Sequence, residues 1–345
     1  MQLWKPSSLL KPVLVKLGRS PNALHHRTRR LLQAGGMTLG RSGPVGPSKP
    51  GRIPPELQNL SLEDLHFTRT KEKHDLVFGV APCLLALTQG RRKVFRLFVK
   101  DVIESQRGES VARVCEEAHK RRLPVQRVSR KELDRMTSGR VHQGLCLQAS
   151  PLAYLMHGGS EKPKGGDLQK RSPLWLVLDG IQDPMNLGAV LRSAYFLGVD
   201  RVASSLRNSC PLTPVVSKAS SGVMELMGVY GFMNLAEMIK MKAEQGWQVV
   251  GTVGFEERNA DVPVLQCSDF RMSKPTLLLM GGEGSGLSRE LRGLCEVLLT
   301  IPPRRDLHPG VESLNVSVAT GILLHSLLSS RPRGTSLTGT TVGMM

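Results

Sequence analysis

The residues most able to do chemistry lie in three loops that each follow an apolar run. The first loop reads LDGIQDPMNLGAVLRSAYFLGVD (178–200), the second GGEGSGLS (281–288) and the third IPPRRDLHPGVESLNVSVATG (301–321). Amide, hydroxyl, carboxylate and guanidinium groups of this kind can orient a ligand, bind an anion or stabilise a developing charge. The candidate residues are Asn186, Arg192, Glu283, Ser313 and Asn315.

The second loop has four glycines between 281 and 286. Such a loop after a strand usually indicates phosphate, because bare backbone N–H groups and a helix N-terminus make an anion site. Glu283 argues against phosphate, since its carboxylate would repel it, and neither the P-loop nor the G-x-G-x-x-G fingerprint fits the spacing. Asp306, at about the distance of a ribose-binding acid, is the one feature in favour of a nucleotide. The loop is interpreted as a site for a neutral or cationic ligand.

Three of the candidates also have a simpler explanation. Asn and Ser are favoured N-cap residues, and Asn186, Ser313 and Asn315 all lie where a helical pattern begins. For Asn186 taken alone, a helix cap is the favoured interpretation. Arg192 follows Asn186 by six residues, which predicts that it returns to a nearby side of the same helix.

Alternating strands and helices must position these loops. Continuous apolar strands flanked by helices indicate a parallel sheet covered on both faces, and ligands of such sheets bind outside the carboxyl ends of the strands. The loops after 178, 280 and 301 are therefore the candidate ligand-binding loops. The predicted strands are 174–178, 247–252, 276–280 and 297–301, and the predicted helices are 187–197, 235–245 and 313–328.

A smaller α/β module with a basic surface precedes this region. Two basic runs could bind RNA phosphates, namely Arg91, Arg92, Lys93 and Lys120, Arg121, Arg122. A solvated helix end is an equally favoured explanation of each run. The predicted helices are 74–89, 110–122 and 130–136, and the predicted strands are 94–99, 124–128 and 144–149.

The chain of 345 residues is strongly basic, with a net charge of +18, and residues 1–55 hold ten Lys and Arg but no Asp or Glu. An acid-free, Arg-rich opening with interspersed leucines has the composition of a mitochondrial transit peptide, and a basic arm that touches RNA is the alternative. No run approaches the roughly 20 apolar residues of a membrane span. The six cysteines show no C-x-x-C and do not cluster with histidines, so neither a disulfide framework nor a metal site is expected.

Taken together, the three loops resemble the signatures of the SpoU/TrmH family of RNA ribose 2′-O-methyltransferases, part of the SPOUT superfamily. DGIQDPMNLGAVLRSA matches D-x-x-x-D-P-x-N-L-G-A-x-x-R-S-A, and GGEGSGL and SLNVSVA follow in the family's order. The sequence VHQG (141–144) resembles the motif that ends the family's small substrate domain. The resemblance spans about residues 66–328.

This resemblance implies an α/β architecture: a C-terminal parallel-sheet SPOUT methyltransferase domain with a deep trefoil knot, preceded by a small α/β RNA-binding substrate domain. It implies S-adenosylmethionine as cofactor and a homodimer with active sites near the shared interface. With the transit-like arm, it implies methylation of a guanosine in large-subunit rRNA of the mitochondrial matrix. A tRNA target and a non-catalytic assembly factor remain alternatives. The expected segments are 1–55 (transit peptide and linker), 66–150 (substrate domain), 151–173 (linker), 174–330 (methyltransferase domain) and 331–345 (tail).

The resemblance also assigns roles to residues. Arg192 would bind the neighbouring phosphate and stabilise the developing alkoxide, since a guanidinium does not readily accept a proton. Asn186 and Glu283 would orient Arg192 and the ribose, and Ser313 and Asn315 would bridge cofactor and substrate. The residues expected to contact the cofactor are Gly281, Gly282, Ile301 and Leu314. The segment PRRDLHPGVE before Ser313 is longer than the family's compact form, and its His308 is expected to be a surface residue.

Overall fold

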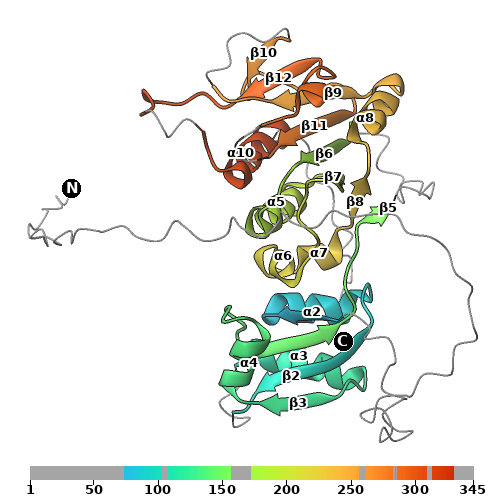
Figure 1. The fold of residues 1–345 in the computed structure, drawn as a ribbon, viewed down its shortest axis with the longest axis vertical. Coiled ribbons are helices and arrows are strands. Elements are labelled where there is room, and N and C mark those ends of the chain that lie inside the picture. Colours follow the sequence, from blue (N-terminus) through green and yellow to red (C-terminus); the bar gives the residue numbers. More distant parts are fainter. Residues whose placement is uncertain are drawn as a thin grey trace, which may run out of the picture. The chain divides into compact units, whose positions relative to one another are not determined.

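The computed structural model describes residues 74–102, 108–156, 172–255, 262–282, 284, 286–308 and 313–329. All of them belong to one compact unit, which contains two β-sheets (Figure 1). The predictions for the arm 1–55, for most of the linker 151–173, for the tail 331–345 and for Glu283 lie outside the described residues. The domain boundaries and the trefoil knot stay predictions.

The smaller sheet has four strands in the order β1-β4-β2-β3. The central strand β4 runs antiparallel to β1 and β2, and β3 runs parallel to β2. Its strands are β1 (Asp75–Phe78), β2 (Val94–Lys100), β3 (Val125–Val128) and β4 (Leu145–Ala149), and its helices are α2 (Val80–Gln89), α3 (Glu109–Lys120) and α4 (Arg130–Met136).

The prediction of one helix over 74–89 is wrong for its first part. The run DLVF forms β1, in which Asp75 lies opposite Ala149 and Phe78 opposite Cys146. Gly79 then takes φ +96°, a conformation that glycine adopts without strain, and the helix begins at Val80. Pairing with a partner distant in sequence therefore overrides the local helical spacing. The other predicted elements of this region are confirmed to within one or two residues at each end.

The larger sheet has eight strands in the order β10-β12-β9-β11-β6-β7-β8-β5, and every pair is parallel, as predicted. Its strands are β5 (Leu155–Met156), β6 (Leu174–Asp179), β7 (Arg201–Ser205), β8 (Val229–Phe232), β9 (Gln248–Thr252), β10 (Val264–Gln266), β11 (Thr276–Gly281) and β12 (Val297–Thr300). Its helices are α5 (Pro184–Leu197), α6 (Pro214–Ala219), α7 (Val223–Leu226), α8 (Leu235–Glu244), α9 (Arg289–Arg292) and α10 (Val316–Leu328).

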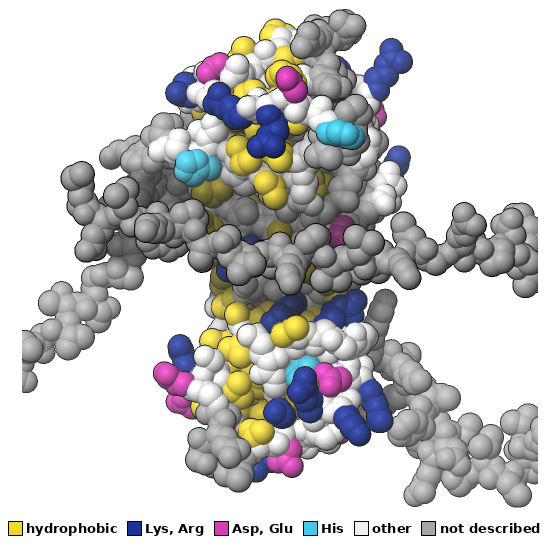
Figure 2. All heavy atoms as spheres, turned by 90° about the vertical axis from the view of Figure 1, so that its left-hand side faces the viewer, with side chains coloured by type: hydrophobic (Ala, Val, Ile, Leu, Met, Phe, Trp, Pro, Cys, Tyr) yellow, Lys and Arg dark blue, Asp and Glu magenta, His cyan; other side chains and the backbone are white. Residues whose placement is uncertain are grey.

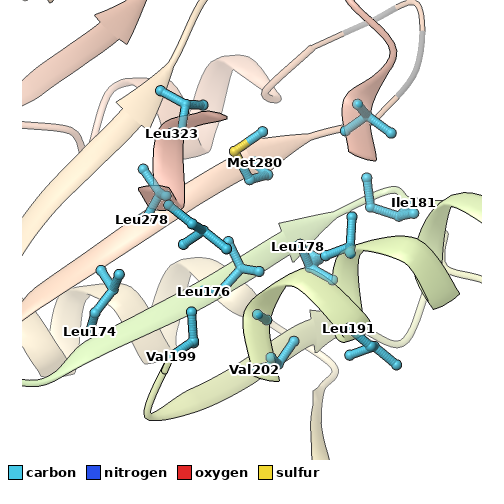
Figure 3. Close-up of a cluster of buried hydrophobic side chains, with 14 of the residues drawn as sticks. Leu174, Leu176, Leu178, Ile181, Leu191, Val199, Val202, Leu278, Met280 and Leu323 are labelled. Atoms are coloured by element: carbon cyan, nitrogen blue, oxygen red, sulfur yellow. The ribbon is translucent and has the colours of Figure 1, made fainter. Parts of the chain in front are cut away.

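The strand β6 lies near the centre of this sheet and is buried on both faces. Its leucines 174, 176 and 178 pack toward α5 and α10, whereas Trp175 and Val177 pack toward α8 and α9. Figure 3 shows the first set, with β6 side chains near Leu191 of α5, Leu278 of β11 and Leu323 of α10. Truncating such a leucine to alanine typically costs about 2–5 kcal/mol. This packing holds α5 and α10 beside each other on one face of the sheet.

The predicted RNA contact of Arg92 is wrong. Its side chain is fully buried, and its Nε donates to both carboxylate oxygens of Glu225 at 2.9 and 3.1 Å, while Nη1 donates to Asp75 at 2.9 Å. Burial raises the pKa of Glu225, and the Arg92 charge opposes that rise. The neighbouring Arg91 donates to the carbonyl of Met224 at 2.6 Å. These arginines therefore join the small sheet region to α7, and Arg92 is not exposed to RNA.

Candidate active site

The loops after β6 and β11 touch at the carboxyl edge of the large sheet. The two strands are hydrogen-bonded neighbours, with Gly281 opposite Asp179. A Cβ placed on Gly282 would lie 2.4 Å from the carbonyl oxygen of Gly180, a distance that no side chain tolerates. Glycine at 282 is thus required for the first two loops to meet.

The glycine loop folds tightly on itself. A Cβ on Gly281 would lie 2.1 Å from the carbonyl carbon of Gly286, whose N–H donates to the carbonyl of Gly282 at 3.2 Å. Gly284 and Gly286 have φ of +86° and +63°. The described glycines of the loop therefore form a tight turn in which Gly281 and Gly282 contact Gly286. In a phosphate-binding loop the backbone N–H groups instead surround an open space for the anion.

Asp183, rather than Asn186, caps α5. Its Oδ1 accepts hydrogen bonds from the N–H groups of Met185 at 2.6 Å and Asn186 at 2.9 Å, and Pro184 occupies the first helical turn. The cap interpretation of Asn186 is therefore wrong. Asp183 satisfies the helix terminus, and the Asn186 side chain turns to another partner.

That partner is Asn315, from the third loop. The Nδ2 of Asn315 donates to Oδ1 of Asn186 at 3.1 Å. The cap interpretation of Asn315 is also correct, because its Oδ1 accepts from the N–H groups of Ser317 at 2.9 Å and Val318 at 3.4 Å. The Nδ2 of Asn315 donates a hydrogen bond and its Oδ1 accepts others, which fixes the orientation of the amide. The helix α10 accordingly begins at Val316, three residues later than predicted.

Arg192 is exposed on α5 and does not lie on the same side as Asn186. Six residues correspond to about 600° of helical rotation, so the two side chains leave the helix about 120° apart. Arg192 instead shares a stripe with Met185 and Phe196, which are 57% and 86% exposed. The predicted return of Arg192 to the side of Asn186 is wrong.

The remaining predicted site residues surround the same edge. Gly281 and Ile301 are half-buried at the ends of β11 and β12, and Ser313 and Leu314 are exposed immediately before α10. His308 is exposed, as predicted for a surface loop. The structure therefore brings together the amides of the first and third loops, with the glycine loop against the first. Sequence reasoning missed Asp183 as the cap, although an acid directly before a proline is a recognisable cap signal.

The segments around the ends of β6 and β11 suit a cationic ligand, whereas the third loop carries the exposed Arg304 and Arg305. No Lys or Arg occurs in residues 173–191 or 275–288, and Asp179 and Asp183 lie in or beside the first loop. Asp179 accepts a long hydrogen bond of 3.5 Å from the N–H of Ser288. Burial, with Asp183 adding to it, raises the pKa of the Cys210 thiol, whose backbone N–H donates to the carbonyl of Ile181. A phosphate would find no cation in the first turns of these loops, and a sulfonium fits them better.

The second predicted basic run, at the end of α3, is engaged in surface ion pairs. Lys120 lies 3.0 Å from Glu116, and Arg121 contacts Glu117. The i,i+4 spacing of both pairs is that of neighbours on one helix face. These contacts favour the solvated-helix explanation, and an RNA role for Lys93, Lys120, Arg121 and Arg122 stays a prediction.

A relative from Homo sapiens, "rRNA methyltransferase 1, mitochondrial", is 50% identical over 281 residues, which cover 80% of this chain and 78% of the relative. Residues 173–325 match the model of the SpoU rRNA Methylase family. The chain belongs to the SpoU rRNA methylase family. Residues 76–155 match the model for RNA 2′-O ribose methyltransferase substrate binding. Family membership confirms the predicted enzyme class, an RNA methyltransferase that uses S-adenosylmethionine.

The chain is also similar to a bacterial relative in sequence and to a solved bacterial structure in fold. "23S rRNA (guanosine-2'-O-)-methyltransferase RlmB" of Shewanella oneidensis is 33% identical over 261 residues, covering 75% of this chain and 99% of the relative. The crystal structure of an rRNA methyltransferase from Sinorhizobium meliloti superimposes with a TM-score of 0.55 at 24% identity, covering 75% of this chain and 88% of that one. This second likeness concerns the fold.

In the described part of the chain, none of the helices is long and apolar enough to cross a bilayer. No group of three or more His, Cys, Asp or Glu side chains there has a geometry that could hold a metal ion.

Proposed function

We propose that this protein transfers a methyl group from S-adenosylmethionine to the ribose 2′-hydroxyl of a guanosine in mitochondrial large-subunit rRNA. The observation that carries the proposal is the hydrogen bond between Asn186 and Asn315, which joins two motifs 129 residues apart beside the glycine loop. The mitochondrial rRNA target follows the name of the human relative, and the guanosine follows that of the bacterial one.

The cofactor would lie against the backbone of the three loops. When bound, S-adenosylmethionine supplies an activated methyl carbon, so the protein has to position the hydroxyl and dispose of its proton. Gly281, Gly282, Ile301 and Leu314 are the residues proposed to hold it. The acid-bearing and lysine-free loops after β6 and β11 fit its positive charge. Positioning of this kind can supply effective molarities of order 10⁵ M or more.

Arg192 is proposed to bind the phosphate next to the target ribose and to stabilise the developing alkoxide. A guanidinium is well suited to both tasks, because it stays charged and presents several N–H donors. Asn186, fixed through Asn315, would orient the ribose, with Glu283 as a second orienting group. Ser313 would bridge cofactor and ribose from its exposed place before α10.

We also propose that the protein is a homodimer formed through α5 and α10. These helices lie side by side, and each exposes large apolar side chains. Phe196 is 86% exposed, and exposed apolar groups of this size in one patch are typical of protein interfaces. Arg192 lies on this face, so dimerisation would place it at the interface. The apolar set is Met185 and Phe196 of α5 with Leu314, Val318 and Ile322 of or next to α10.

Light scattering on the full-length protein tests the dimer. The wild type is expected to have twice the monomer mass, and Phe196→Asp is expected to be monomeric because the carboxylate would be buried in the interface. Phe255→Asp, a change at a 42% exposed position outside α5 and α10, is the matched control. A monomeric wild type would refute the dimer.

The location is proposed to be the mitochondrial matrix. The acid-free, basic opening and the name of the human relative support import. A fusion of residues 1–55 to a fluorescent protein is expected to reach the matrix. Retention of that fusion in the cytosol would contradict this part of the proposal.

Mapping of ribose methylation after depletion of the protein tests the target. One 2′-O-methylguanosine in mitochondrial large-subunit rRNA is expected to be lost and to return with the wild-type gene but not with Arg192→Ala. Loss of a mark from a tRNA alone would replace the rRNA assignment. Unchanged methylation of all mitochondrial RNAs, together with no binding of S-adenosylmethionine, would favour a non-catalytic assembly factor.

A further inference from the structure

The small sheet region contains a pocket away from the three loops. Its volume is about 440 Å³, and it lies between the end of β2, the start of α3, the helix α4 and the turn at 139–144. Its walls combine apolar and basic side chains. The apolar ones include Val102, Val111 and Val141, and the basic ones are Lys100, Arg130 and Arg140.

The turn that bounds the pocket is held rigidly. The ring of His142 is buried, its Nδ1 accepts the N–H of Gly144 at 3.0 Å, and its Nε2 lies 3.1 Å from Asp134 Oδ1. Since Nδ1 is an acceptor, the proton lies on Nε2, and this nitrogen donates to Asp134. Both ring nitrogens are therefore used to shape the pocket. Positive φ at Gln143 and Gly144, of 55° and 82°, completes the turn.

The pocket carries net positive charge. Asp134 is its one carboxylate, and it is shared between His142 and Arg130, whose Nε lies 3.8 Å away. Within the described part of the chain, Lys100 and Arg140 form no salt bridge. Gly108, which precedes the 12-residue helix α3 without a side-chain cap, also lines the pocket, and Glu109 in the first turn of α3 offsets part of the positive charge of that helix end. An anionic ligand with an apolar portion matches these walls.

We propose that this pocket binds one unpaired nucleotide of the substrate rRNA, with the base against the valines and its phosphate on Lys100 and Arg140. The inference rests on the proposed rRNA substrate and adds a recognition site to it. The volume lies in the range of small-ligand pockets. Sequence-specific RNA readers commonly bind bases that have left the helical stack, and apolar side chains can pack against such bases.

The same turn is bonded to the methyltransferase domain. Gln143 Oε1 accepts from Lys218 Nζ of α6 at 2.7 Å and from the N–H of Val80 at 3.2 Å. Burial lowers the pKa of Lys218. A nucleotide held beside this turn is thereby anchored to α6. The pocket acts as a fixed point from which the RNA extends toward its methylation site.

Figure 2 faces the side on which α4 lies in Figure 1. It shows Lys and Arg side chains gathered around a His side chain on this region, with apolar side chains beside them. The exposed basic surface of the small region thus includes the pocket, whereas Arg92, which the sequence places in a basic run, is buried.

The test compares two double variants of the full-length protein. Lys100→Ala with Arg140→Ala removes the two phosphate-binding cations, and Lys240→Ala with Lys274→Ala removes the same charge from exposed positions on α8 and before β11. Binding of a large-subunit rRNA fragment is measured by fluorescence anisotropy over a range of salt concentrations, and S-adenosylmethionine binding by calorimetry. The pocket variant is expected to bind RNA at least 10-fold more weakly, with a salt slope reduced by about 1.5 and unchanged cofactor affinity. The control is expected to bind as the wild type does.

A third variant, Val102→Trp, tests the base site without a charge change. It is expected to weaken binding about 10-fold and to leave the salt slope unchanged, because it fills the apolar part alone. Circular dichroism confirms that each variant is folded. If the pocket variants bind rRNA as tightly as the control does, the pocket proposal is wrong while the proposed function stands. If the wild-type protein binds no rRNA, the proposed function and the pocket fall together.

Discussion

In the large sheet every strand pair is parallel, and the loops that carry Asn186, Gly282 and Asn315 leave the same edge. In the small sheet β4 runs antiparallel to both of its neighbours, and the pocket there takes its residues from a strand, two helices and a turn. Parallel strands gather the residues that follow them into one place, so each loop can be recognised in the sequence as a continuous motif. In the pocket only the turn VHQG (141–144) is a continuous motif, and the other lining residues are scattered on or next to β2, α3 and α4.

The arginines of the two regions differ in the same way. Arg192 belongs to a motif, and the structure leaves it exposed on α5, about 120° around the helix from Asn186. Arg92 belongs to a basic run that suggests RNA binding, yet it is buried between two carboxylates. A run of basic residues in the sequence is therefore weak evidence for RNA binding, because the element that carries each residue decides whether its side chain is exposed.

Loss of the buried ion pair is expected to have the largest effect on stability. Glu225→Ala would leave the Arg92 side chain buried with one carboxylate fewer, which typically costs about 3–5 kcal/mol. Urea unfolding of Glu225→Ala beside Glu296→Ala, which removes a half-exposed partner of Lys274, measures the difference. Equal midpoints for the two variants would show that the small region is held to α7 by other contacts.

Loss of Arg192 is expected to have the largest effect on catalysis. Arg192→Ala should lower methyl transfer by about 100- to 1000-fold, as removal of one charge-stabilising donor does elsewhere, and should leave stability unchanged because the side chain is exposed. Single-turnover transfer from radiolabelled S-adenosylmethionine measures it. If Arg192→Lys transfers methyl at a near-normal rate but binds RNA more weakly, its role is positional. Full activity of Arg192→Ala would contradict both roles.

Removal of the hydrogen bond from Asn315 to Asn186, with the cap of α10 kept, is expected to lower catalysis less than the loss of Arg192 does. Asn315→Asp keeps the oxygen that caps α10 and replaces the Nδ2 that donates to Asn186. A lost hydrogen bond of about 0.5–1.5 kcal/mol should lower kcat/KM by about 3- to 10-fold with little change in melting temperature. Asn315→Ala, which also removes the cap, should lose about 1 kcal/mol of stability. Equal activity of the wild type and Asn315→Asp would show that this bond does not serve catalysis.

The exposed pairs at the end of α3 should matter least. Lys120→Ala is expected to change the free energy of unfolding by less than about 0.5 kcal/mol, because surface i,i+4 pairs contribute little. A loss of several-fold in rRNA affinity on Lys120→Ala alone would restore this helix end as an RNA contact and weaken the contrast with the pocket.

The sequence allows much of the large sheet to be predicted, because strands such as 174–179 are continuous apolar runs. It does not reveal the segment between Arg201 and Phe232, where four short elements form. β7 reads RVASS, and its buried serines are accommodated by hydrogen bonds such as that from Ser204 to Ser209, which an apolar pattern cannot show.

The sequence singles out the three loops, but it does not give the geometry of their side chains. The motifs indicate Asn186 and Asn315, but which residue caps which helix depends on competition among neighbours such as Asp183 and Pro184. The rotation of Arg192 away from Asn186 follows from their spacing of six residues on one helix. The turn at 142–144 depends on a bond to Asp134 of α4, which local spacing does not encode.

The bond between Asn186 and Asn315 also determines when the site can exist during synthesis. Chains emerge from the ribosome from the N-terminus at about 5–20 residues per second. The first two loops can therefore fold before Asn315 has been made, and they would form the glycine turn without the amide that completes the site. A chain in which α10 has not docked lacks the hydrogen bond between Asn315 and Asn186, so the site is completed by the last described helix.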